Sequence, residues 1–419
     1  MTFTRRTFIR GGLTACTVGF AAPRLLVDAA LAQSTRPRAL VVLHLSGGND
    51  GLSMLVPYAD PFYAERRPTL AVPAASALQI GMDAAGTPLG FHPSLAGLRD
   101  TFDRGQLAIM PRVGHPEQTR SHFLETDVWS TADPASPLGT GWLGRYLDML
   151  PPPFDPFAGW STATESPHAF ERSGPGAPAI PDPAAFRLAT LNAGDEAMHE
   201  EHAMGRVSSH LRPALPHIVP VTAAGEAALA SLDRVALVGA YVPAAVYPND
   251  ALGLAFKTIA GAIATDMATR IFWVEASGYD THAGQGTNGG RYAALFRGLD
   301  NALRAFRDDL TAQGLWNDTL LLQFSEFGRR ITENGSHGTD HGAASVMLAM
   351  GGLVRGGLHG TAASLDPDPG NPTLEDNGSD VRFETDFRAV YARTLDGWLG
   401  ADAAALLGGD FLTGAPAFL

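Results

Sequence analysis

Five short apolar runs divide this chain, and each one borders a cluster of glycine and polar residues. They lie at residues 38–51, 107–114, 269–280, 319–328 and 345–352. Continuous apolar runs of this length, rich in β-branched residues, are typical of strands covered on both faces, as in a parallel sheet. The runs therefore predict five buried strands.

Helical patterns separate these strands, at residues 92–105, 291–314 and 383–400. The middle pattern is the clearest, because leucine and phenylalanine recur along it at helical spacing and Gly314 provides a C-terminal cap. Strands that alternate with helices predict a three-layer α/β/α sandwich around a mostly parallel sheet. A Pro-rich segment at about residues 150–220 interrupts the alternation, and we interpret it as an insertion or cap over the sheet.

Composition excludes some classes of partner. The 419 residues carry a formal net charge of -13, without a basic patch, which argues against nucleic acid. No apolar run after the N-terminal segment reaches the length of a membrane span. The partner we expect is a small anionic ester. The sequence does not indicate an oligomeric state.

The first 32 residues read as a twin-arginine (Tat) export signal. Arg5 and Arg6 precede a weakly apolar stretch that ends in the small-x-small tripeptide at residues 30–32. We therefore expect export by the Tat translocon to the periplasm or beyond, with residues 33–419 as the mature domain. Cys16, the single cysteine, also lies in a lipoprotein-like box. That alternative predicts acylation at Cys16, whereas cleavage before Gln33 excludes it.

Polar residues gather next to every predicted strand. In open α/β sheets, ligands bind outside the carboxyl ends of the strands, so side chains at these positions are expected to converge. In chain order they are Asp50; His115, Arg120, Ser121 and His122; Glu275, Asp280 and His282; Glu326 and Arg329; and Asp340 and His341.

This mixture of carboxylates and imidazoles suits divalent metal ions. Zinc, manganese, calcium and magnesium all accept oxygen or mixed oxygen and nitrogen ligands. Such a site can polarise a phosphoryl or sulfuryl oxygen and activate a serine hydroxyl or water. Arg120 or Arg329 would neutralise an anionic substrate.

Each residue also has a purely structural interpretation. Asp50 after Gly-Gly suits a turn or helix cap, and Asp280 before threonine suits a turn. Ser121-His122 is typical of a helix start, Glu326 of an ion pair with a nearby arginine, and Asp340 of a cap. His44 lies inside the first strand, where a hydrogen-bonded core histidine is the simplest interpretation.

Several motifs together resemble a bacterial family, the domain of unknown function 1501 (DUF1501). They are LSGGNDGLSMLVPY, RSHF, GYDTHAGQ, SEFGRR, NGSHGTDHG and MGGLVRGG, and the resemblance runs from about residue 38 to the C-terminus. The family resembles a distant branch of the alkaline phosphatase and sulfatase superfamily. That resemblance implies an alkaline phosphatase-like α/β sandwich with one or two divalent metals.

The resemblance also implies roles for particular residues. Asp50 matches the superfamily's first metal ligand, and Ser121, with Arg120 beside it, matches the place of the nucleophile. Asp280 and His282 resemble the metal-binding pair after the third strand.

The stretch from Glu326 to His341 aligns with the superfamily in two ways. In one, Asp340-His341 is the Asp-His pair, and His359 would be the last histidine. In the other, which follows strand order and which we prefer, Glu326 replaces the aspartate and His341 is the last histidine. Phe327 then stands in place of a histidine, and Asp340 is a ligand or a partner of His341.

Two functions emerge as expectations. The first is an exported metal-dependent hydrolase of phosphate or sulfate esters, with Ser121 as nucleophile. Asp50 and Glu326 would hold one metal, and Asp280, His282 and His341 would hold the other. The alternative is an exported binding or assembly protein that retains the hydrolase fold without turnover.

Overall fold

The five predicted strands form the centre of one eight-stranded sheet in the computed structural model. The structure describes residues 37–152, 155–174, 176–186, 196, 199, 203, 230–287 and 289–419. The chain divides into two units, Met1–Pro37 and Arg38–Leu419, and the sheet with all of its helices belongs to the second. The predicted export signal, residues 1–32, lies outside the described residues.

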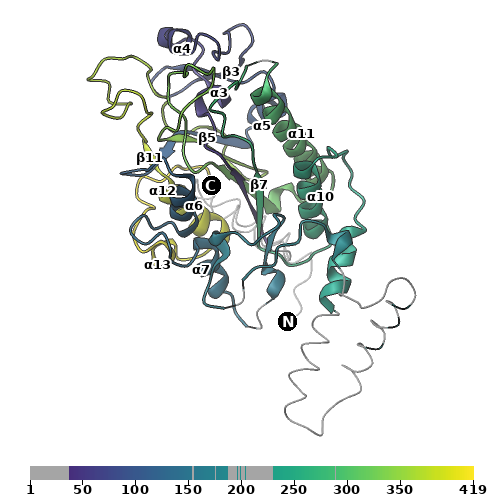
Figure 1. Ribbon diagram of the computed structural model, residues 1–419. Coiled ribbons are helices and arrows are strands. Elements are labelled where there is room, and N and C mark those ends of the chain that lie inside the picture. Colours follow the sequence, from purple (N-terminus) through teal and green to yellow (C-terminus); the bar gives the residue numbers. More distant parts are fainter. Residues whose placement is uncertain are drawn as a thin grey trace, which may run out of the picture. The chain divides into compact units, whose positions relative to one another are not determined.

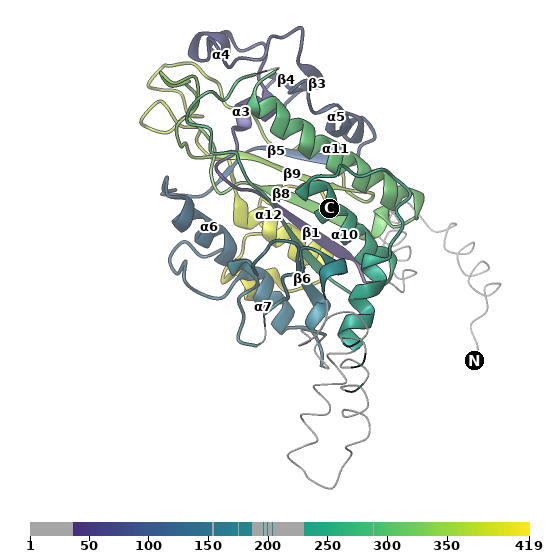
Figure 2. The ribbon, with the colours of Figure 1, turned by 45° about the vertical axis from the view of Figure 1, so that its right-hand side comes forward.

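The sheet has the order β10-β5-β9-β8-β1-β7-β6, and β11 also pairs with β5 (Figures 1 and 2). Every pairing is parallel except those of β9 with β5 and β8, so the expected mostly parallel sheet is confirmed. The strands are β1 (Ala39–Leu45), β5 (Leu107–Gly114), β6 (Gly159–Ser161), β7 (Ile271–Ala276), β8 (Thr319–Phe324), β9 (Ser345–Gly351), β10 (Gly357–Leu358) and β11 (Thr385–Asp386).

Helices cover both faces, as the three-layer prediction requires (Figure 2). One face carries α5 (Ala96–Asp103), α10 (Ala251–Ala264) and α11 (Arg291–Ala312). The other face carries α6 (His122–Thr131), α7 (Trp142–Asp148), α12 (Phe387–Thr394), the π-helical turn η5 (Leu395–Leu399) and α13 (Ala403–Leu407).

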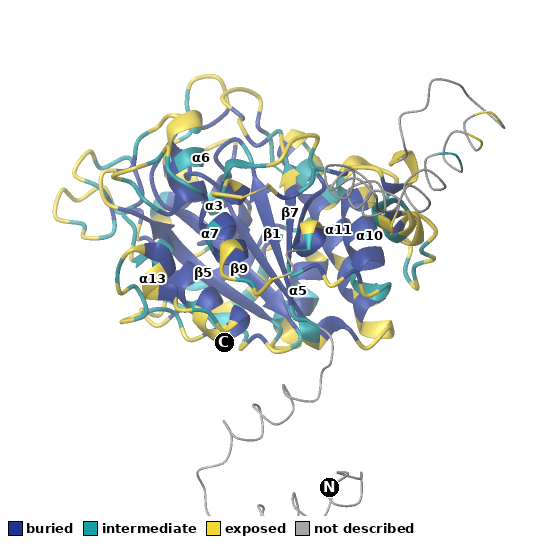
Figure 3. Cartoon of the chain, turned by 90° about the horizontal axis from the view of Figure 1, so that it is seen from below, coloured by how far each residue is buried: buried dark blue, intermediate teal, exposed yellow. Residues whose placement is uncertain are grey.

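Strand β1 shows why its sequence is continuously apolar. All seven of its residues are buried (Figure 3). Val41 and Leu43 pack with α10 and α11, whereas Leu40 and Val42 pack with α6 and α12. A strand between two helical layers has no solvent face, so the alternation of apolar and polar residues disappears.

A small antiparallel sheet lies apart from the main one and was not predicted. It consists of β2 (Leu55–Val56), β4 (Pro88–Phe91) and β3 (Leu78–Met82), near the short helices α3 (Gly51–Met54) and α4 (Pro61–Arg66). Strands β2 and β4 have only two and four residues, and β3 is partly exposed, so none of them leaves a long apolar run in the sequence.

The Pro-rich segment is only partly described. Its described part holds strand β6 and the 3-10 turns η1 (Pro156–Ala158), η2 (His168–Phe170) and η3 (Pro183–Ala185). A fourth such turn, η4 (Trp316–Asp318), precedes β8. Because β6 pairs with β7, the start of the segment extends the main sheet. Most of residues 187–229 lie outside the described part, and the predicted cap stays a prediction.

Candidate metal centre

One edge of the sheet collects side chains from four chain segments. The ends of β1, β7 and β8 lie side by side there, since His44 pairs in register with Glu275 and Phe324. Strand β9 runs in the opposite direction, so its beginning reaches the same edge next to the end of β5. The side chains that precede β9 therefore meet those that come after the parallel strands.

Three imidazoles and a carboxylate converge at this edge. His122, Asp280 and His341 each offer one ligand atom within 4.8 Å of the others. The Nε2 atom of His341 lies 3.1 Å from Nε2 of His122 and 2.8 Å from Nε2 of His282. Asp280 Oδ1 lies 3.2 Å from Nε2 of His282 and 3.3 Å from that of His341. Its Oδ2 lies 3.7 Å from His122 Nε2.

The opposite ring nitrogen of each imidazole meets an oxygen acceptor. The Nδ1 contacts are His122 to Glu326 Oε1 at 2.7 Å, His282 to Asp340 Oδ1 at 3.2 Å, and His341 to the Arg120 carbonyl at 2.8 Å. These partners assign the hydrogen to Nδ1 in each neutral ring, so the lone pairs lie on Nε2. Lone pairs that face one another at about 3 Å repel unless a cation or a proton lies between them. Imidazoles oriented in this way are typical of metal ligands.

The donor set fits zinc. Zn–N bonds of roughly 2.0–2.1 Å in a tetrahedron place neighbouring ligand atoms about 3.3 Å apart. The Nε2 atom of His341 lies 2.8 and 3.1 Å from the other two Nε2 atoms, and the three Nε2 atoms lie 3.2 to 3.7 Å from an Asp280 oxygen. Calcium and magnesium prefer oxygen ligands throughout, so three imidazoles favour zinc, with manganese next, among the four metals expected.

Glu326, an expected ligand, lies behind the cluster. Its carboxylate is buried and accepts hydrogen bonds from His122, from His44 Nε2 at 3.1 Å and from the Gly47 amide at 2.9 Å. Burial alone would raise the pKa of Glu326, but the hydrogen bonds from His122 and His44 lower it well below the usual value. Both oxygens are engaged, so Glu326 orients His122 instead of joining the ligands. His44 is a hydrogen-bonded core histidine.

Asp340 also supports an imidazole. Its Oδ1 accepts from His282 and from Asn334 Nδ2, the latter at 2.9 Å. The Asn334 bond is the largest cause of the lowered pKa of Asp340, and His282 adds to it. Asp340 was expected to be a ligand or a partner of His341. In the structure its carboxylate pairs with His282 instead.

Asp50 takes no part in the cluster. It is buried and paired with Arg67, whose guanidinium reaches its two oxygens at 2.6 and 3.0 Å. Ser53 and Gln285 donate two more hydrogen bonds of 2.6 Å. Burial, the largest single effect, would raise the pKa of Asp50, but the charge of Arg67 and the hydrogen bonds from Arg67, Ser53 and Gln285 together hold the pKa below the usual value. The structure therefore corrects the assignment of Asp50 as a ligand: it belongs to a buried ion pair.

Ser121 and Arg120 lie beside the cluster on the loop that leads into α6. Ser121 is exposed and caps α6, accepting from the Leu124 amide at 3.5 Å. The Arg120 guanidinium is partly exposed and pairs with the buried Asp380. A cavity of about 260 Å³ borders Arg120, with Gln118 and Ala343 in its lining.

His122 lies in the cluster although it was not among the expected ligands. The sequence places it directly after Ser121, where a polar residue is ordinary at a helix start. The order of strands was the available signal, since every other predicted strand also delivers a polar residue to this edge. Phe327 packs against the cluster, with its ring centroid 4.7 Å from that of His122 and 4.8 Å from that of His341.

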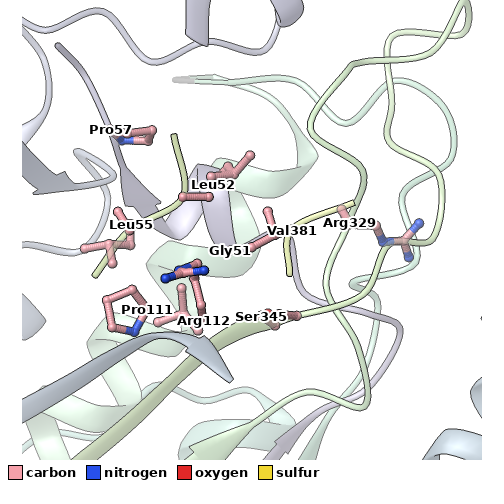
Figure 4. A pocket seen from close by; sticks show the side chains of 13 residues that line it. Gly51, Leu52, Leu55, Pro57, Pro111, Arg112, Arg329, Ser345 and Val381 are labelled. Carbon is pink, nitrogen blue, oxygen red and sulfur yellow. The ribbon is translucent and has the colours of Figure 1, made fainter. Parts of the chain in front are cut away.

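Arg329 is not free to meet a substrate, contrary to one expectation. It is 2% exposed, and its donors are used within the protein. A narrow cavity of about 20 Å³ also borders it, between Gly51, Leu55 and Arg112. Figure 4 shows the Arg329 guanidinium turned away from the other labelled side chains of this cavity. The cavity has room for about one water molecule.

The chain belongs to the family described as protein of unknown function (DUF1501), whose model matches residues 37–369. This confirms the resemblance seen in the sequence motifs. No curated protein sequence matches the chain.

Solved structures with some likeness include three proteins, each 10% identical to this chain. One is the C-terminal periplasmic domain of EcEptC from Escherichia coli in complex with zinc (TM-score 0.33, 76% of this chain and 74% of that chain covered). Another is the PsFucS1 sulfatase from Pseudoalteromonas sp. (TM-score 0.31, 80% of this chain and 67% of that chain covered). The third is the phosphonate monoester hydrolase of Agrobacterium radiobacter (TM-score 0.29, 89% of this chain and 78% of that chain covered). Likeness at these TM-scores says nothing about what this chain does.

Proposed function

We propose that this DUF1501 protein is a metal-dependent hydrolase of phosphate or sulfate esters. One observation carries the proposal: three imidazoles with oxygen-bonded Nδ1 atoms direct their Nε2 atoms at one another beside the Asp280 carboxylate. We assign His122, Asp280, His282 and His341 as the metal ligands. The resemblance to the alkaline phosphatase and sulfatase superfamily suggests the substrate class.

A divalent metal held there supplies Lewis-acid polarisation of a phosphoryl or sulfuryl oxygen. The chain's own residues would bind and attack the ester. Ser121 is the proposed nucleophile, because its exposed hydroxyl directly precedes the ligand His122. Arg120 would pair with the anionic group, since its guanidinium is partly exposed at the adjoining cavity.

Export belongs to the same proposal. The twin arginines and the cleavage tripeptide before Gln33 support transport by the Tat translocon to the periplasm. Among the described residues, no helix is long and apolar enough to cross a bilayer. Sequencing the N-terminus of the exported protein tests this point, and a start at residue 33 is expected.

The activity test uses residues 33–419 loaded with zinc or manganese, with aryl phosphate, phosphodiester and aryl sulfate substrates. Asp280→Ala should abolish turnover together with metal binding. Ser121→Ala should abolish turnover and leave the metal content unchanged, whereas Ser364→Ala, at a distant exposed serine, should alter neither. Activity that survives Asp280→Ala contradicts the proposal. Activity that survives Ser121→Ala alone makes water the nucleophile.

The non-catalytic alternative has one specific observation in its favour. Phe327 packs on two of the imidazoles in a place where the resemblance leads us to expect a histidine ligand. Metal bound by the wild-type chain without turnover of any ester in the panel would support a binding or assembly protein.

A further inference from the structure

Arg329 is a buried cation at the metal centre, and each of its three side-chain nitrogens donates within the protein. Its Nε donates to the Gly48 carbonyl at 2.7 Å, and its Nη1 donates to the Thr339 carbonyl at 2.7 Å. Its Nη2 donates to Asp280 Oδ1 at 2.7 Å, to the Tyr279 carbonyl at 3.3 Å and to the Gly47 carbonyl. A rigid guanidinium fork can hold several acceptors in fixed directions at once.

These acceptors come from three separate chain segments. Gly47 and Gly48 come after β1, the segment at residues 279–280 comes after β7, and Thr339 precedes β9. Two of the three segments carry or adjoin metal ligands. Packing around the fork is close: a Cβ at Gly47 would collide with the Asp280 backbone, and one at Gly48 with the Phe327 ring. Both glycines also have positive φ angles of 115° and 70°, a region that favours glycine.

The fork also fixes the direction of the Asp280 carboxylate. Arg329 binds Oδ1, which also lies 3.2 Å from His282 Nε2 and 3.3 Å from His341 Nε2, whereas Oδ2 has His122 Nε2 as its neighbour at 3.7 Å.

The surrounding carboxylates are already committed. Glu326 binds His122, Asp340 binds His282, and Asp50 binds Arg67. His122, Asp280 and His341 offer ligand atoms within 4.8 Å of one another, and His282 Nε2 lies 2.8 Å from that of His341, so these four residues suffice for one four-coordinate ion. A second dication would also lie close to the fixed charge of Arg329, and like charges repel.

We propose that Arg329 is a positioning residue that presents Asp280 to the metal and restricts the centre to a single ion. The inference rests on the metal site of the proposed function and does not depend on turnover. Neighbours of a ligand that act in this way commonly change metal affinity 10- to 100-fold when they are substituted.

The test compares zinc binding by the wild-type chain, Arg329→Lys, Arg329→Gln and Arg330→Gln. Arg330 is the matched control, because it is the next residue in the chain and its side chain is 47% exposed. Calorimetric titration gives the affinity for zinc alone, and elemental analysis gives zinc per chain. The visible absorption of the cobalt-substituted protein reports ligand geometry at saturation, which a loss of stability alone would not change.

We expect one zinc per wild-type chain. Affinity should fall at least about 10-fold in Arg329→Gln and less in Arg329→Lys, which keeps the charge without the fork. The cobalt spectrum should change in both variants and stay unchanged in Arg330→Gln. If Arg329→Gln does not fold, Arg329→Lys carries the test.

Two zinc ions per wild-type chain, or Arg329 variants with unchanged affinity and spectrum, would overturn the inference. Zinc bound as expected without hydrolysis of any ester would instead overturn the proposed activity and leave the inference standing. A wild-type chain that binds no metal overturns both.

Discussion

Two aspartates at the same sheet edge show how a structural carboxylate differs from a proposed ligand. Asp50 is 1% exposed, and cationic or hydrogen-bonding neighbours meet both of its oxygens. The Asp280 side chain is 48% exposed and faces imidazole lone pairs as well as Arg329. Both residues follow a strand and pair with an arginine, so the difference lies in the other neighbours. Asp50 is enclosed by Ser53 and Gln285, whereas Asp280 also lies beside the Nε2 atoms of three imidazoles.

The largest expected effect is on stability and comes from Asp50. Asp50→Ala leaves Arg67 buried without its partner, which should lower the free energy of unfolding by about 3–5 kcal/mol. Urea denaturation with Asp50→Ala measures the loss. The double change Asp50→Leu with Arg67→Met should recover much of it, because no buried charge remains. A loss that the double variant does not recover contradicts the ion-pair interpretation.

The next effect concerns metal affinity and comes from Asp280. Asp280→Asn keeps the shape of the side chain but removes the charge, so zinc affinity should fall by more than about 100-fold, beyond the effect typical of a ligand's neighbour. Calorimetric titration checks this, and stability of the metal-free chain should change much less than in Asp50→Ala. Unchanged zinc affinity in Asp280→Asn would break the comparison.

A smaller effect on affinity is expected at Glu326. Glu326→Gln retains an acceptor for His122 but loses the charge that favours its orientation, so zinc affinity should fall roughly 10- to 100-fold. Glu125→Gln is the matched control, because Glu125 is also buried and bonded to a histidine, His115, outside the cluster. Equal changes in the two variants would mean that Glu326 acts only through general stability.

The smallest effect is expected at His168, an imidazole whose two ring nitrogens both face oxygen acceptors. Its Nδ1 meets Asp127 Oδ1 at 2.8 Å and its Nε2 meets the Gly139 carbonyl at 2.7 Å, so the protonated ring satisfies both. Burial lowers its pKa, but these acceptors outweigh burial and the pKa is raised.

A raised pKa in the folded state means that the contribution is fully present below the unfolded pKa, about 6.5, and is lost as pH rises through the folded value. His168→Gln should therefore cost about 1 kcal/mol at pH values below about 6 and less in alkaline solution. Urea denaturation on both sides of this window checks the sign. A larger cost in alkaline solution would contradict it.

The sequence was informative where a feature is local and repeated. Runs buried on both faces predicted the five central strands, and helical spacing of leucines predicted α11. The antiparallel direction of β9 was not predicted, because an apolar run has no direction. The order of segments along the chain nevertheless placed polar residues at one edge, and there the structure brings His122, Asp280 and His341 together.

The partners of individual side chains were harder to predict, because they come from distant segments. Arg67 decides the role of Asp50, and nothing near Asp50 in the sequence indicates it. Likewise His44 and His122 take both oxygens of Glu326 from opposite sides. His122 was overlooked because its neighbour Ser121 does cap a helix, which gave the pair a sufficient local explanation.

The reversal of β9 has a consequence for folding. Because the start of β9 reaches the sheet edge, His341 touches His122 although 219 positions separate them in the chain. A bound ion would therefore cross-link segments far apart in a chain whose single cysteine, Cys16, leaves no intrachain disulfide possible. An ion that binds only the folded form, where these segments meet, stabilises it by mass action. The melting temperature should then rise with the concentration of free zinc.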